Sequence, residues 1–334
     1  KILHPGYRTA KLAEIKQNTA DTKTFVFDTG KSFYFRAGQY VTLGCKVGES
    51  EVSRPYAISS SPKGALKGRV ALTVKKSGFF SGYLFDNAAV GDEFTIGDPS
   101  GDFYYEPVKD AAHVVALAGG SGITPFYSMA QAIADGTEDF KLTIIYGAKK
   151  ENEIIFKTEL DKLVSEKIKL VYVLSDEVKE GYEHGFIGAE IIKKYAEGDF
   201  TVMMCGPAAM YAFADKELTA FRLPLRRIKK EANCAGLRDV KEQEFCLTVR
   251  IGFDTFNVPA DSRETVLTAM ERGGLRVPSK CRAGGCGFCH SKLVSGKFSI
   301  AGADKRRLAD EKFGYFHPCC SYPDSDMELI VPKV

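Results

Sequence analysis

The sequence predicts a chain of several domains in which an antiparallel β-barrel is followed by a doubly wound parallel α/β domain. Short runs of alternating or β-branched residues, separated by Gly, Pro, Asp and Asn turns, fill the first 107 residues. This pattern of short runs and turns is typical of antiparallel barrels. Beyond residue 112, apolar runs alternate with stretches of helical period, as expected for parallel strands joined by crossover helices. The length of 334 residues is enough for two or three domains.

The individual elements follow from these patterns. The barrel strands are expected in TKTFVFD, QYVTLGC, GRVALTVKK and DEFTIG, and the parallel strands in HVVALA, KLTIIYGA, IKLVYVLS and FTVMMC. Helices are expected in TPFYSMAQAIADG, NEIIFKTELDKLVSE and SRETVLTAMERGG. The predicted domains cover residues 1–107, 108–232 and 242–334, with a polar linker at 233–241.

The composition excludes several classes of protein. With 44% hydrophobic and 27% charged residues, the chain is not typical of disordered, collagen-like or coiled-coil proteins. A net charge of +3 argues against a dedicated nucleic-acid binder. No membrane-spanning stretch and no signal-peptide core is present in the sequence, so a cytoplasmic location is expected. Because the chain begins with Lys1 rather than Met, we leave open that an N-terminal segment is missing.

Nine cysteines are unevenly distributed along the chain. Four are scattered, namely Cys45, Cys205, Cys234 and Cys246, whereas five crowd into the last 54 residues, namely Cys281, Cys286, Cys289, Cys319 and Cys320. Clustered cysteines in a chain without secretory features indicate metal or redox chemistry. The cluster is therefore the first candidate for a functional site.

The cysteine loop has the spacing C-x4-C-x2-C at Cys281, Cys286 and Cys289, with Cys319 as a fourth candidate. This is the plant-type spacing for a two-iron two-sulfur (2Fe-2S) cluster, which needs four thiolates. The glycines between the cysteines allow positive φ and let backbone N–H groups point at anionic sulfur. Zinc is the alternative, but zinc ribbons favour two separated C-x2-C pairs.

Residues 246–334 resemble plant-type 2Fe-2S ferredoxins. The resemblance rests on PSKCRAGGCGFC, the following KLVSGKF, and GYFHPCCSYPDSD around the last cysteine. It implies a β-grasp fold with Cys281, Cys286, Cys289 and Cys319 as iron ligands. Cys320 is then expected to be a small buried side chain.

A flavin site is predicted in the barrel. Arg54 offers paired donors to a phosphate, Tyr56 offers a flat face to a ring, and Ser60 offers a hydroxyl. The string RPYAISS resembles the flavin motif of the ferredoxin–NADP reductase superfamily, which adds Ala57 and Ile58 to the expected contacts. Ala57 replaces a serine of that motif, so side-chain assistance at flavin N5 is in doubt. A second superfamily element, GFFSGYL, places Gly78, Ser81 and Leu84 at the flavin pyrophosphate. That element favours FAD over FMN. Reductases of the phthalate dioxygenase reductase type use FMN, so FMN is the alternative.

A nucleotide site is predicted after the strand HVVALA. The loop GGSGITP lets the backbone approach a pyrophosphate at a helix start, and the superfamily carries the same string. The cofactor-binding residues expected there are Gly119, Gly120, Gly122, Thr124 and Pro125. The resemblance also implies that Cys205 lies beside the nicotinamide as the catalytic residue, followed by Gly206 and Pro207. A buried inert thiol is the alternative for Cys205.

The choice between NADH and NADPH rests on the end of the strand LVYVLS. Ser175, Asp176 and Glu177 are expected near the adenosine ribose. Carboxylates there suit a free 2′-hydroxyl, whereas NADPH sites usually offer Arg or Lys. The sequence therefore favours NADH over NADPH.

The three predicted sites together indicate an electron-transfer enzyme. NADH gives up two electrons at once and the cluster accepts one, and flavin chemistry joins the two steps. The order of modules resembles the phthalate dioxygenase reductase type, which implies an electron-accepting partner protein such as an oxygenase. Residues 242–334 carry 13 Lys plus Arg against 12 Asp plus Glu, so this module lacks the acidic surface of free plant ferredoxins and its partner need not be basic. The alternatives are an electron-delivery subunit of a larger, possibly anaerobic, redox complex and a redox sensor.

Overall fold

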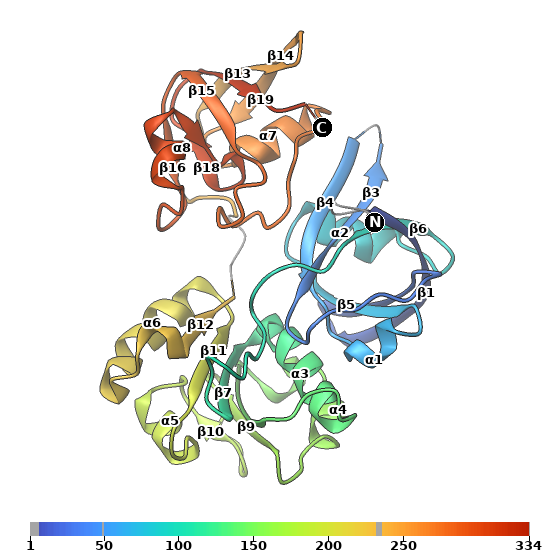
Figure 1. Cartoon of the computed structure of the whole chain (residues 1–334), viewed down its shortest axis with the longest axis vertical. Coiled ribbons are helices and arrows are strands. Elements are labelled where there is room, and N and C mark those ends of the chain that lie inside the picture. The colour runs from blue at the N-terminus through green and yellow to red at the C-terminus, as the bar shows by residue number, and fades with distance from the viewer. Residues whose placement is uncertain (1–6, 49, 232–235, 334) are drawn as a thin grey trace. The chain divides into compact units, whose positions relative to one another are not determined.

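The computed structural model describes residues 7–48, 50–231 and 236–333 (Figure 1). The chain splits into two compact units, Lys1–Leu43 with Tyr56–Glu231, and Gly44–Pro55 with Ala232–Val334. Cys234 lies outside the described residues. No helix of the described chain is long and apolar enough to cross a membrane.

The N-terminal region forms an antiparallel β-barrel, as predicted. Its six strands run in the order β4-β3-β6-β1-β2-β5. A bridge between Ile58 and Leu72 connects the two ends of this order and closes the barrel. The strands and helices are β1 (Tyr7–Thr19), β2 (Thr22–Asp28), β3 (Tyr40–Val47), β4 (Ser50–Ala57), β5 (Arg69–Lys75), β6 (Glu93–Gly97), α1 (Pro62–Ala65) and α2 (Phe79–Asn87).

The central region is a parallel sheet with helices on both faces, also as predicted. Its order is β10-β9-β8-β7-β11-β12, and the residues of β7, β8 and β9 are almost entirely apolar because both faces are covered. The strands are β7 (His113–Gly119), β8 (Lys141–Ala148), β9 (Ile168–Leu174), β10 (Glu183–His184), β11 (Thr201–Cys205) and β12 (Ile228–Lys230).

Two helices cover each face of this sheet (Figure 1). One apolar cluster joins Phe126 and Leu160 to the sheet, and another joins Ile192 and Leu218 to its opposite face. The helices are α3 (Thr124–Ala134), α4 (Lys157–Asp161), α5 (Ala189–Tyr195) and α6 (Ala208–Leu218), with short 3-10 turns at η1 (Gly120–Ile123), η2 (Glu151–Glu153), η3 (Thr219–Phe221) and η4 (Leu225–Arg227). The helix expected in NEIIFKTELDKLVSE is reduced to α4, because Phe156 has a left-handed φ of 62° and interrupts it.

The C-terminal region is a five-stranded mixed sheet of order β14-β13-β19-β15-β17, packed against α7 (Val266–Arg272). This is the β-grasp architecture that the ferredoxin resemblance implies. Thr265 caps α7 by accepting a hydrogen bond from the Thr268 N–H at 3.3 Å. The remaining elements are β13 (Glu244–Ile251), β14 (Asp254–Asp261), β15 (Ser291–Ser295), β16 (Phe298–Ile300), α8 (Leu308–Lys312), β17 (Tyr315–Phe316), η5 (Pro318–Cys320), β18 (Ser321–Pro323) and β19 (Met327–Val331).

Candidate functional site

The predicted nucleotide loops meet at the point where the parallel sheet reverses its strand order. From β7 the chain proceeds through β8 and β9 on one side, and then returns to place β11 on the other side of β7. Cys205, at the end of β11, pairs in register with Ala118 on β7. In open α/β sheets, ligands bind in the crevice at the carboxyl ends of the two strands that flank such a reversal.

The two loops are in such close contact that position 122 requires glycine. A Cβ on Gly122 would lie 2.0 Å from the Cys205 carbonyl oxygen. Cβ atoms on Gly119 and Gly206 would each lie within 2.8 Å of the Met210 side chain. A side chain at position 122 would push the loops apart, whereas side chains at positions 119 and 206 would displace Met210.

The loop after β7, residues 119–125, is fixed by hydrogen bonds to its backbone carbonyls. Gly120 adopts a left-handed φ of 53°, and its carbonyl accepts a hydrogen bond of 2.9 Å from the buried Tyr146 hydroxyl. The Thr124 hydroxyl donates to the Ser121 carbonyl at 3.1 Å, and Pro125 occupies the first turn of α3. The free N–H groups and positive end of a helix that starts here suit a nucleotide phosphate.

The second loop is fastened by a tyrosine that the sequence did not single out. The Tyr211 hydroxyl accepts a hydrogen bond from the Gly206 N–H at 3.3 Å and donates to the Glu231 carbonyl at 3.0 Å. It also lies beside the Cys205 thiol. Burial, followed by the negative charge of Glu231, raises the pKa of the Cys205 thiol, so this side chain is held protonated. A protonated thiol beside a nicotinamide site acts through position and hydrogen bonding rather than as a base.

The predicted adenosine-ribose residues follow β9. Ser175 and Asp176 are tied by their backbone N–H groups to the carbonyls of Ala148 and Lys149, at 3.1 and 3.0 Å. The Ser175 hydroxyl donates to the Asp176 carboxylate at 2.5 Å. The segment that pairs with Ser175 and Asp176 therefore brings two exposed lysines, Lys149 and Lys150, close to the predicted ribose site. These two cations oppose the preference for NADH that Asp176 predicts.

The flavin motif runs along β4. Arg54 and Tyr56 are two residues apart on this strand, so their side chains share one face. The Arg54 guanidinium donates to the Ser53 carbonyl at 2.7 Å. Tyr56 stacks on Phe80 of α2 with ring centroids 6.3 Å apart, which brings the two predicted flavin elements together. Ile58 is fully buried in the barrel.

The end of the flavin motif is anchored to α3, the helix that begins at the first nucleotide loop. The Ser128 hydroxyl donates to the Ser60 carbonyl and the Gln131 amide to the Ser59 carbonyl, each at 2.7 Å. The Ser60 hydroxyl accepts from the Ala71 N–H at 3.0 Å. The predicted flavin and nucleotide sites therefore share one rigid support within the first unit.

The second flavin element surrounds the start of α2. Ser81 is buried, and its hydroxyl accepts from the N–H groups of Ser77 and Gly78 at 3.0 and 2.9 Å. It also donates to the Gly78 carbonyl at 3.0 Å. Leu84 points into the barrel core and is fully buried. In this structure Ser81 therefore shapes the loop through its own backbone, as a cap does.

The four cysteines predicted as iron ligands converge in the C-terminal unit. The Cys281 thiol lies beside the thiols of Cys286 and Cys319, and the Cys289 thiol lies beside that of Cys319. Interaction with the neighbouring thiols lowers the pKa of the Cys281 thiol and raises that of Cys319. The N–H groups of Ala283 and Cys286 also point at the Cys281 sulfur, at 3.4 and 3.5 Å. Convergent sulfurs with backbone donors aimed at them fit an anionic 2Fe-2S cluster.

The loop around these cysteines is fixed by a histidine. His317 is buried, and its Nδ1 hydrogen-bonds with the Gly284 carbonyl at 2.8 Å. Gly284 has a φ of +73°, and a Cβ there would lie 2.6 Å from the Cys320 sulfur. Cys320 itself is buried in a small cluster with Leu267, as expected for a packing residue.

A site for a single metal ion is a separate question from the cluster site. Within the described residues, no group of three or more His, Cys, Asp or Glu side chains is placed to hold a metal ion. The four converging cysteines would instead share two irons in a 2Fe-2S cluster, with two ligands to each iron.

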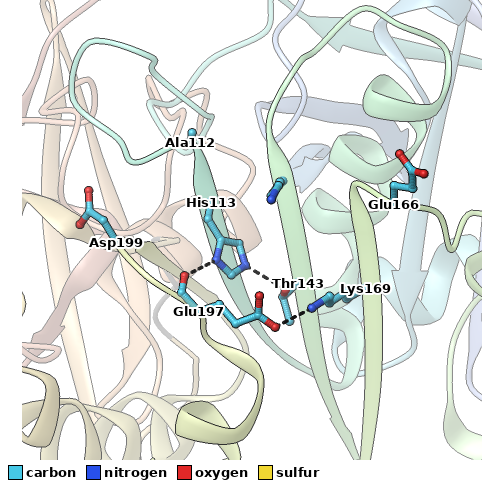
Figure 2. A pocket seen from close by; sticks show the side chains of 8 residues that line it. Ala112, His113, Thr143, Glu166, Lys169, Glu197 and Asp199 are labelled. Atoms are coloured by element: carbon cyan, nitrogen blue, oxygen red, sulfur yellow. Dashed lines mark hydrogen bonds and ion pairs between the residues drawn. The ribbon is translucent and has the colours of Figure 1, made fainter.

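A cavity of about 290 Å³ lies at the opposite, amino-terminal edge of the parallel sheet. Figure 2 shows His113 at its centre, with Nδ1 bonded to the Glu197 carbonyl at 3.1 Å and Nε2 to the Thr143 hydroxyl at 2.9 Å. Lys169 pairs with the Glu197 carboxylate at 2.8 Å. Both histidine nitrogens are occupied by hydrogen bonds within the protein, so His113 has a structural role.

Models of three protein families match the chain in sequence order. An oxidoreductase FAD-binding domain matches residues 9–105, an oxidoreductase NAD-binding domain residues 116–216, and a 2Fe-2S iron-sulfur cluster binding domain residues 251–324. The chain is an oxidoreductase of the ferredoxin reductase type. The predicted cofactors, FAD, NAD and a 2Fe-2S cluster, are thereby confirmed for this reductase at the level of its domains.

Relatives of the reductase match it along nearly its full length. A glycine betaine monooxygenase reductase subunit from Chromohalobacter salexigens is 28% identical, covering 97% of this chain and 95% of its own. NADH oxidoreductase HCR from Escherichia coli is also 28% identical, covering 94% and 95%. The solved structure of phthalate dioxygenase reductase covers 98% of both chains with a TM-score of 0.71 and 22% identity, which confirms the predicted fold.

Proposed function

We propose that the reductase takes electrons from NADH and passes them through FAD and the 2Fe-2S cluster to a separate protein, an oxygenase component. The observation that carries the proposal is α3, which starts at the nucleotide loop and holds the end of the flavin motif by two hydrogen bonds of 2.7 Å. Such a support keeps two reacting cofactors in a fixed geometry, which lowers the barrier to transfer between them. The relative named as a monooxygenase reductase subunit favours an oxygenase as acceptor.

We propose distinct roles for the residues of the two cofactor sites. When bound, FAD accepts an electron pair from NADH and releases electrons singly. Arg54 binds a flavin phosphate and Tyr56 covers the ring, while the backbone of Ala57 and Ile58 and the Ser60 segment hold its edge. Gly78 and its neighbours, shaped by Ser81 and Leu84, receive the pyrophosphate.

On the nucleotide side, the backbone of Gly119, Gly120 and Gly122 binds the NADH pyrophosphate at the start of α3, where Thr124 and Pro125 lie. Cys205, Gly206 and Pro207 position the nicotinamide. In the second unit, Cys281, Cys286, Cys289 and Cys319 hold the cluster. We further propose the domain limits 1–107, 108–232 and 242–334, and a cytoplasmic location.

The preference for NADH over NADPH rests on Asp176. Its carboxylate suits a ribose hydroxyl and repels a 2′-phosphate. Lys149, whose carbonyl accepts the Asp176 N–H at 3.0 Å, has the opposite tendency. The ratio of kcat/KM for the two nucleotides decides between them. NADH is expected to be favoured at least tenfold, and a tenfold preference for NADPH would overturn this assignment.

The alternative is an acceptor other than an oxygenase. The test is reconstitution of the reductase with purified oxygenase components under air. NADH and O2 consumption that depends on both proteins supports the proposal. Rapid NADH oxidation with an artificial acceptor, but none with any oxygenase, favours the alternative. Reduction of the cofactors by NADH without turnover of any acceptor would favour a redox sensor.

A further inference from the structure

A cavity of about 490 Å³ opens beside the predicted cluster in the C-terminal unit. The exposed Cys286 lines it together with Gly285, Gly287 and Phe288 of the cysteine loop. Its other wall is built by Lys305, Arg307, Asp310 and Lys333. A partner protein that docks over this cavity therefore lies next to Cys286, one of the predicted iron ligands.

The charge around the cavity is positive. Arg307 and Asp310 neutralise each other through two hydrogen bonds of 2.8 and 2.9 Å. Lys305 and Lys333 are exposed, and neither forms an ion pair with any residue that the structure describes. Two uncompensated ammonium groups are therefore left at the mouth of the cavity, although residues 242–334 are nearly neutral as a whole.

Apolar side chains accompany these charges. Phe288, which lines the cavity, is 43% exposed, and Leu308, next to Arg307, is 85% exposed. A few exposed apolar anchors surrounded by charges are typical of small, transient interfaces, to which electron-transfer complexes belong. Charges at the rim of such an interface mainly set the rate of association and the choice of partner.

We propose that this basic cavity, defined by Cys286, Phe288, Lys305, Arg307 and Lys333, is the docking site for the electron acceptor, and that the acceptor presents a carboxylate-rich surface to it. The inference rests on the proposed function. The transfer moves one electron from the reduced cluster to the acceptor, with no bond formed or broken. Free plant ferredoxins are acidic and bind basic partners. The basic cavity of this reductase instead selects an acidic partner.

The experiment follows the reoxidation of the NADH-reduced cluster by rapid mixing with two haem proteins, the acidic cytochrome b5 and the basic cytochrome c. In Lys305→Glu/Lys333→Glu, the bimolecular rate with cytochrome b5 is expected to fall about tenfold at low ionic strength, and the rate with cytochrome c to rise. Added salt should reduce both differences. Lys162→Glu/Lys216→Glu makes the same change in net charge on exposed residues of the nucleotide domain and is expected to leave both rates unchanged.

Three outcomes overturn the proposal. Unchanged rates with both haem proteins show that the cavity is not the docking site, and equal effects of the two double variants show that only net charge matters. If the charge reversal slows reduction of the cluster by NADH but not its reoxidation, the cavity serves electron entry. Failure of NADH to reduce the cluster in the unmodified reductase would instead contradict the proposed function.

Discussion

The Ser128 hydroxyl donates a hydrogen bond of 2.7 Å to the Ser60 carbonyl, which joins the helix after the first nucleotide loop to the last residue of the flavin motif. Ser128 is fully buried, so this bond is shielded from competing water. Gln131, one turn further along α3, repeats the arrangement with the Ser59 carbonyl. The distance between the two cofactor sites is thus set by a single helix.

Ser128→Ala is expected to slow electron transfer from NADH to flavin about tenfold, because small displacements of reacting groups have large effects on rate. The free energy of unfolding should fall by only about 1 kcal/mol. Anaerobic stopped-flow bleaching of the flavin measures the step, with Ser165→Ala, an exposed serine far along the chain, as control. An unchanged bleaching rate in Ser128→Ala would show that α3 does not set the geometry.

Tyr211→Phe removes the hydroxyl that connects the Gly206 N–H to the Glu231 carbonyl. We expect kcat to fall about tenfold with a change in KM for NADH of less than about threefold, since the loop positions the nicotinamide rather than supplying affinity. Tyr195→Phe is the matched control, because the Tyr195 hydroxyl donates to Glu183 and not to the loop after β11. A rise in KM alone would assign Tyr211 to binding instead.

Gly284 and Gly285 provide a matched pair in the cysteine loop. Gly284 has a φ of +73° and lies against the Cys320 sulfur, whereas a Cβ on Gly285 meets no atom within 4 Å. Gly284→Ala should therefore lose most of its iron and its visible cluster absorption, while Gly285→Ala retains both. Equal iron contents in the two variants would contradict this account.

The contact with Cys320 can be tested separately. Cys320→Ala removes the sulfur that a Cβ at position 284 would strike, so it should restore part of the iron content to Gly284→Ala. On its own, Cys320→Ala should keep the cluster, because Cys320 is not among the four predicted ligands. Loss of the cluster in Cys320→Ala would place it among the ligands.

The pH dependence of Cys205 follows from desolvation of this half-buried thiol, which raises its pKa. At about pH 8.5, where an ordinary thiol ionises, Cys205 should remain protonated and react slowly with iodoacetamide. The exposed Cys246 serves as internal comparison in a peptide map. Because the folded state keeps a proton that the unfolded chain loses, stability should decline as the pH rises through this range. Equal labelling of Cys205 and Cys246 would contradict the assignment.

The fold was largely predictable from the sequence because its signals are local. The change from alternating to continuous apolar runs separates the barrel from the parallel sheet, and Pro125 indicates a helix start directly. The length of the helix at α4 was overestimated because Phe156 adopts a left-handed backbone conformation, which cannot be predicted from a phenylalanine.

The candidate sites were predictable only in part. Motif glycines and cysteines could be named because their chemistry and spacing are in the sequence. Tyr146, Ser128, Tyr211 and His317 could not, since each acts through a backbone group that folding brings near: Gly120, Ser60, Gly206 and Gly284. The positive cavity was hidden for the same reason, because Lys305 and Lys333 are far apart in sequence and the charge of the module sums to almost zero.

The central claim is that NADH reduces both the flavin and the cluster of one chain. An anaerobic titration with NADH, followed by absorption and electron paramagnetic resonance, tests it most directly. The flavin and cluster bands should bleach together and reach an end point at about one and a half NADH per chain, since flavin takes two electrons and the cluster one. Bleaching of the flavin with a cluster that stays oxidised would contradict the claim.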